Sequence, residues 1–145
     1  MAEKPEPTRP LPSLAEPDTE PFWRATADER LTYPVCDYCG TLVFYPRRTC
    51  TGCVHGDLRW RESAGLGRIY TFTVIRQNGS PYFRAQLPYV LAYVDLDEGF
   101  RMLTEVVAAP EEVRVGQRVQ LRWAGADGTV KIPVFAPAGD GLGRA

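Results

Sequence analysis

Four cysteines in two close pairs constrain this chain more than any other feature. Cys36 and Cys39 form one pair and Cys50 and Cys53 the other, in the spacing C-x2-C-x10-C-x2-C. A two-residue gap lets both sulfurs of a pair reach one ion, and zinc takes four thiolates in a tetrahedron. The ten-residue spacer is long enough for one hairpin. The spacing therefore predicts a small rubredoxin-like zinc ribbon over residues 31–60.

The proposed ion is expected to be structural. Four thiolate ligands leave no coordination position for a reacting water. Tetrahedral thiolate sites also accept iron, so the spacing leaves zinc and iron open. Disulfides are disfavoured because the N-terminus lacks a signal-peptide layout, which predicts a cytoplasmic protein. His55, the only histidine, is an alternative ligand in place of Cys53.

A short helix is predicted before the ribbon. Asp18 or Thr19 is a candidate cap, Pro21 suits the first turn, and the apolar pattern runs to about Arg30. Trp23 is the expected anchor of this helix.

The rest of the chain is mainly β. Thirteen glycines, thirteen prolines and sixteen aromatic residues are typical of short strands joined by turns. Five such runs suit a Greek-key barrel of the OB type. They cover residues 67–76, 89–96, 101–107, 118–123 and 129–135.

Composition divides the chain into four parts. Residues 1–17 carry five prolines and no apolar periodicity, which predicts a disordered or extended arm. We expect the helix and ribbon over residues 18–60, the OB-fold over 61–137 and a flexible tail over 138–145.

No catalytic set is evident. The chain has a single histidine, and all four cysteines are expected to bind the metal. These two features exclude most triad and acid–base mechanisms. Asp95, Asp97 and Glu98 form an acidic group, but a DEG turn between strands is more typical of a solvated hairpin tip. Gly65 and Gly67 lack the third glycine and the following helix of a dinucleotide site.

Several stretches agree in order with one known family: CDYCG with CTGC, then GRIYTFTVIR, PYVLAYVDLDEGFRMLTEVV, VRVGQRVQL and IPVFAPA. Over residues 20–137 the chain resembles the zinc-ribbon and OB-fold acyl-CoA-associated proteins, long known only as a domain of unknown function. The resemblance implies a non-catalytic accessory subunit of a thiolase-like or lipid-transfer-protein-like enzyme. It also implies a two-plus-two assembly with acyl-CoA at or near the interface, and favours retro-aldol cleavage of a steroid side-chain acyl-CoA.

The connection over residues 77–88 is the predicted contact surface. It is long for a hairpin, and longer loops of small β domains are often binding elements. Tyr82 and Phe83 could face a partner, while Arg76 and Arg84 could pair with CoA phosphates or carboxylates. An alternative is single-stranded nucleic-acid binding, because residues 59–84 mix arginines with aromatic residues.

Overall fold

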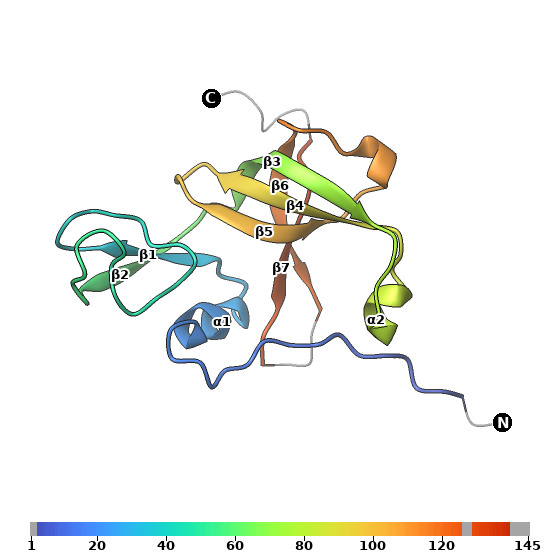
Figure 1. The fold of residues 1–145 in the computed structure, drawn as a ribbon, viewed down its shortest axis with the longest axis horizontal. Helices are drawn as coiled ribbons and strands as arrows, with labels where there is room; N and C mark the ends of the chain where they lie inside the picture. The colour runs from blue at the N-terminus through green and yellow to red at the C-terminus, as the bar shows by residue number, and fades with distance from the viewer. Residues whose placement is uncertain (1–2, 126–128, 140–145) are drawn as a thin grey trace.

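The computed structural model describes residues 3–125 and 129–139, and it consists of a helix, a ribbon and a barrel (Figure 1). Helix α1 (Glu20–Thr26) leads into strand β1 (Thr32–Cys36), which pairs antiparallel with β2 (Leu58–Glu62). Between the two cysteine pairs, Leu42 forms one isolated bridge with Val35. The two-stranded ribbon projects to one side of the barrel.

The barrel closes in the order β3-β4-β5-β7-β6. β5 and β7 pair parallel through Val106 and Phe135, and every other neighbouring pair is antiparallel. This is the five-stranded OB arrangement, so the predicted fold class is confirmed. The strands are β3 (Leu66–Ile75), β4 (Tyr89–Leu96), β5 (Arg101–Val106), β6 (Arg118–Ala124) and β7 (Ile132–Pro137).

Alternation along β4 shows why these residues form a barrel. Val90, Ala92 and Val94 are almost fully buried, whereas Tyr93 between them is exposed. A period of two places one set inside and the other on the outer surface. Gly67 permits the tight pairing with β4, because a Cβ there would lie 2.5 Å from the Asp95 carbonyl oxygen.

Phe22, and not the predicted Trp23, anchors α1. Phe22 is 2% exposed, whereas Trp23 is only partly buried. The helix has seven residues, too few for periodicity to show which aromatic side chain faces the core. Thr26, one turn later, is also buried, and its hydroxyl accepts a 3.1 Å hydrogen bond from the Lys131 backbone N–H. Helix α1 is therefore fixed to the end of the barrel.

Aromatic rings join the ribbon to the barrel. Phe44 of the ribbon lies 6.0 Å from Phe22 and 4.7 Å from Phe100, measured between ring centroids. Tyr33 of β1 lies 4.8 Å from Phe100, which belongs to the β4–β5 hairpin. Such contacts add to the burial of large apolar surfaces. The helix, ribbon and barrel consequently share one hydrophobic core.

The acidic group of the β4–β5 hairpin is structural. Asp95 pairs with Arg101, and Asp97 pairs with Arg118. Glu98 accepts hydrogen bonds from the segment that joins the ribbon to the barrel. The prediction that this turn is a solvated hairpin tip is therefore wrong for Glu98. Its partners lie 34 and 35 residues earlier in the sequence, so no local pattern indicates them.

The N-terminal arm crosses one side of the molecule. From α1 it runs in extended form past β7 toward α2 (Pro81–Arg84), a single turn within the 77–88 connection (Figure 1). Arg9 makes its principal contacts with β5 and α2. Within residues 3–125 and 129–139, no helix has the length and apolar character needed to cross a membrane.

Candidate functional site

The four cysteine sulfurs lie together at the tips of the ribbon. All four lie within 4.8 Å of one another. Cys36 and Cys53 are separated by 3.6 Å and Cys39 and Cys50 by 3.5 Å, measured between sulfurs. A tetrahedron with metal–sulfur bonds of 2.3 Å has edges of about 3.8 Å, whereas a disulfide bond is about 2.05 Å long. The residues therefore fit one tetrahedral metal ion.

The electrostatics of the cysteine cluster also favour the binding of a cation. Hydrogen bonds with the Thr41 side chain and backbone lower the pKa of Cys39 to about 6. The pKa of Cys53 rises instead to about 12: the hydrogen bond with the His55 backbone lowers it, but burial and the three neighbouring thiols outweigh that effect. Four thiolates this close repel one another unless a positive ion balances them.

His55 lies beside the cluster rather than in it. Its Nδ1 atom is 3.3 Å from the Cys53 sulfur and 3.2 Å from the Cys53 carbonyl oxygen. The ring stacks on Tyr38 at 4.0 Å between centroids. Cys53 itself completes the sulfur cluster, so the geometry favours Cys53 as the fourth ligand.

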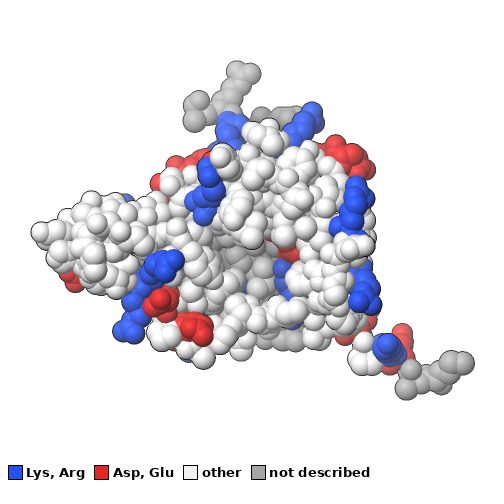
Figure 2. All heavy atoms as spheres, in the orientation of Figure 1, with Lys and Arg blue, Asp and Glu red and all other residues white. Residues whose placement is uncertain are grey.

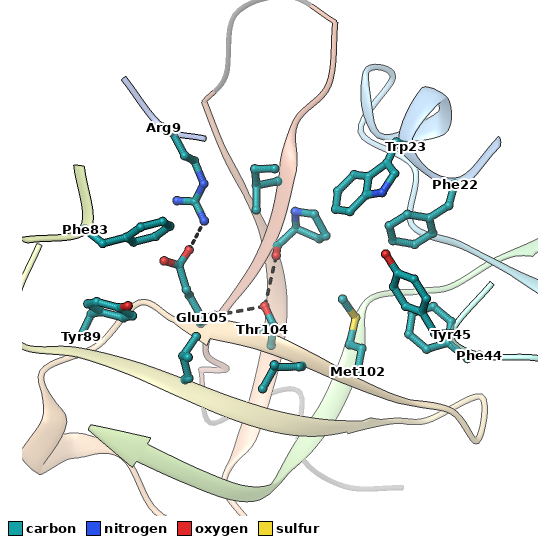
Figure 3. Close-up of a pocket in the computed structure, with 14 residues that line it drawn as sticks. Arg9, Phe22, Trp23, Phe44, Tyr45, Phe83, Tyr89, Met102, Thr104 and Glu105 are labelled. Atoms are coloured by element: carbon teal, nitrogen blue, oxygen red, sulfur yellow. Dashed lines mark hydrogen bonds and ion pairs between the residues drawn. The ribbon is translucent and has the colours of Figure 1, made fainter. Parts of the chain in front are cut away.

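An apolar cavity of about 440 Å³ lies between the ribbon, α1 and the barrel. Phe22 and Trp23 come from α1, Phe44 and Tyr45 from the ribbon, and Met102 from β5 (Figure 3). Figure 2 shows the hollow on this face, and the atoms around it belong mostly to uncharged residues. The lining also includes Arg9, Phe83, Tyr89, Leu91, Leu103, Thr104, Glu105, Ile132 and Pro133.

One ion pair lies at the end of this cavity away from the ribbon. Arg9 of the arm pairs with Glu105 of β5, and its Nη1 lies 3.4 Å from the Tyr82 hydroxyl. The guanidinium also lies over the rings of Tyr82 and Phe83, 5.5 and 5.4 Å from their centroids. Arg9 could not be found from the sequence, because nothing in a proline-rich arm indicates a partner 96 residues away.

The structure separates the four predicted contact residues. Tyr82 and Phe83 are partly buried beneath Arg9, and Phe83 packs on Tyr89 at 5.7 Å. Arg76 and Arg84 are exposed, and Arg84 donates a 3.3 Å hydrogen bond to the Gly79 carbonyl. Contact between these residues and a partner or CoA stays a prediction.

The arginines of residues 59–84 are divided between the ribbon and the barrel. Arg59 pairs with Asp37 on the ribbon, whereas Arg68 donates to the Gly116 carbonyl on the barrel. The ring of Tyr70 is covered by Arg101, 3.4 Å from its centroid. An aromatic platform for bases needs open ring faces beside a continuous basic surface.

The fold and the site together define a class: zinc-ribbon and OB-barrel proteins with a cavity between the two units. Family models match both parts of the chain. Residues 23–59 match the ChsH2 rubredoxin-like zinc ribbon domain, and residues 60–124 match the ChsH2 C-terminal OB-fold domain. The chain belongs to this ChsH2 family, which confirms the predicted resemblance.

Relatives carry several names. A "Probable enoyl-CoA hydratase alpha subunit" of Thermomonospora curvata is 36% identical over 94% of this chain, which spans only 42% of that protein's length. A "DUF35 domain-containing scaffold protein" of Methanothermobacter thermautotrophicus is 31% identical, with 78% of this chain and 90% of that protein covered. "Benzoylsuccinyl-CoA thiolase subunit BbsA" of Geobacter metallireducens is 30% identical, with 59% of this chain and 56% of that protein covered.

A solved structure has a similar fold. It is described as "Ltp2-ChsH2(DUF35) aldolase", and the matching chain is 35% identical with a TM-score of 0.80. The match covers 90% of this chain and 100% of that chain.

Proposed function

We propose that this chain is a non-catalytic accessory subunit that binds a thiolase-like enzyme and supports carbon–carbon bond chemistry on acyl-CoA. The observation that carries the proposal is the cavity between ribbon and barrel, with its apolar walls and open side. Among the described residues that line it, no nucleophile is paired with a base, so the cavity is suited to hold an apolar group rather than to transform it.

The relatives support the choice of partner. The matching solved structure is named for Ltp2 together with ChsH2, and BbsA is a subunit of a benzoylsuccinyl-CoA thiolase. Both names associate a protein of this family with acyl-CoA or aldolase chemistry, as one part of a larger assembly. The favoured reaction is retro-aldol cleavage of a steroid side-chain acyl-CoA by the partner, in a two-plus-two complex.

Exposed apolar residues mark the surface that the partner would cover. Tyr45 and Leu103 line the cavity and are 53% and 56% exposed. Leu103 also borders a smaller hollow, of about 200 Å³, together with Tyr93 and residues of β3. Burying one such side chain contributes about 1.5–3 kcal/mol. A partner seated here would close the cavity and bury these side chains together.

The metal ion would support partner binding indirectly, through the shape of the ribbon. We assign zinc to Cys36, Cys39, Cys50 and Cys53, where it would hold the ribbon in shape and so fix one wall of the cavity. A cluster of reduced thiols favours a reducing compartment, so we place the complex in the cytoplasm.

Sedimentation of the chain with a co-expressed thiolase-like enzyme from a neighbouring gene tests the proposal. Wild type should form one heavier complex, and Leu103→Asp should weaken it at least about tenfold, because a charge replaces a buried apolar group. Val115→Asp is the matched control, since Val115 is also an exposed aliphatic residue but lies in the turn before β6. Failure of wild type to associate, or equal loss in both variants, would contradict the proposal.

A further inference from the structure

A second cavity adjoins the first. It has a volume of about 470 Å³ and shares Arg9, Tyr89 and Glu105 with the first cavity. Its remaining lining is Tyr82, Gln86, Pro88, Val107, Ala108, Ala124 and Val134. The two cavities are therefore neighbours along one groove, and the shared residues stand at their boundary.

The Arg9–Glu105 pair forms the boundary from two separate elements. Glu105 projects from β5, and Arg9 reaches it from the arm (Figure 3). The side chains are only 13% and 19% exposed. The rings of Tyr82 and Phe83 hold the guanidinium from α2. Three elements distant in sequence thus place one charged pair across a groove whose other described lining residues are uncharged.

Several interactions stabilise the Arg9–Glu105 ion pair. Burial opposes the charge of Arg9, but hydrogen bonds with Glu105 and Tyr82 outweigh it and keep the pKa of Arg9 above its ordinary value. An apolar ligand that pushed the guanidinium aside would leave Glu105 unpaired in a poorly solvated place, which is costly. Displacing the pair is therefore costly for an apolar ligand that extends from the first cavity into the second.

We propose that Arg9, paired with Glu105, is a specificity-determining residue that limits the length of the acyl group accepted by the first cavity. The inference rests on the proposed function, since it concerns the acyl group that the cavity would hold. A short or compact acyl group ends at the pair, whereas a longer one would have to enter the second cavity.

The test is calorimetric titration of the complete complex, wild type or variant, with saturated acyl-CoA probes from four to sixteen carbons. Each newly buried methylene is worth about 0.8 kcal/mol, or about fourfold in affinity. Wild type should gain affinity with length and then level off. Arg9→Ala should continue to gain affinity by about fourfold per methylene beyond that length.

Two further variants keep the test decisive. Arg9→Ala with Glu105→Gln removes both charges, so the extended response should survive even if the single variant is destabilised by an unpaired carboxylate. Lys4→Ala removes a different, solvent-exposed cation of the same arm and should keep the wild-type profile. The inference is overturned if both Arg9 variants level off at the wild-type length, or if Lys4→Ala extends it equally. Failure of the complex to form contradicts the proposed function instead, and a complex that binds no probe contradicts both.

Discussion

Glu98 holds Ser63 at the junction between the ribbon and the barrel. Both carboxylate oxygens lie 2.9 Å from the Ser63 hydroxyl, and the Ala64 backbone N–H donates to Oε1 at 2.7 Å. The Ser63 oxygen also accepts from the Gly65 backbone N–H at 3.0 Å. Ser63 is 7% exposed. The hairpin between β4 and β5 therefore fixes residues 63–65, which connect the ribbon to the barrel. This segment orients the ribbon wall of the cavity relative to the barrel wall.

Loss of this link should loosen the ribbon. We expect Glu98→Ala to lower the free energy of unfolding by about 2 kcal/mol, because hydrogen bonds to a charged group are lost and the buried Ser63 hydroxyl loses an acceptor. Urea denaturation measures the change. Glu111→Ala, at an exposed acidic position in the 3-10 turn Pro110–Glu112, should change it by less than about 0.5 kcal/mol. Equal stability of the two variants would contradict the link.

Asp97 should contribute to stability in a pH-dependent way. Its hydrogen bond with Arg118 lowers the pKa of Asp97 in the folded state. The carboxylate therefore stabilises the fold above the unfolded pKa of about 3.9, and this contribution disappears as the pH falls through the lower folded value. The melting temperature of wild type should exceed that of Asp97→Asn at pH 6, and the difference should vanish near pH 2. Asp28→Asn, at an exposed position, is the control and should melt close to wild type at pH 6.

Removal of one metal ligand should unfold the ribbon and spare the barrel. The ribbon's own core consists of Cys36, Val43 and Cys50, too small a cluster to persist without the ion. We expect Cys50→Ser to lose the single bound zinc, measured by atomic absorption. Hydrogen exchange should rise over residues 36–58 and stay slow in β4 and β5. Persistent protection of the ribbon in a metal-free variant would contradict a structural role for the ion.

Gly67 should tolerate no side chain. An added Cβ would lie 2.5 Å from the Asp95 carbonyl oxygen and 2.8 Å from Val94 Cγ1, so β3 and β4 would have to separate. We expect Gly67→Ala to lower the free energy of unfolding by about 3 kcal/mol or more, as overpacking does in well-packed interiors. Gly79→Ala is the control, because nothing lies within 4 Å of its added Cβ. Similar melting temperatures for both variants would refute the close approach.

Local patterns predicted the ribbon and most of the barrel. The cysteine spacing requires the sulfurs to converge, and the alternation of β4 lies within eight residues, so short-range rules suffice for both. The last strand was less well predicted, because it begins at Ile132 rather than residue 129. Residues 126–128 lie outside the described part of the chain.

The cavity could not be predicted in the same way. Its walls come from the arm, α1, the ribbon, α2 and several strands, and no local period links them. The Arg9–Glu105 pair joins residues 96 positions apart, and Glu98 reaches a junction 35 residues earlier. Phe22 and Trp23 are adjacent, so only packing against the barrel decides which one is buried. Long-range contacts of this kind appear only when the elements are assembled.

Reconstitution of activity tests whether this chain supports catalysis by a partner enzyme. A thiolase-like partner is assayed for acyl-CoA carbon–carbon bond cleavage while increasing amounts of this chain are added. We expect this chain alone to be inactive, and we expect the partner's rate to rise with added chain and to saturate at a fixed molar ratio. Cleavage by this chain alone, or a partner rate that is independent of it, would contradict the accessory role.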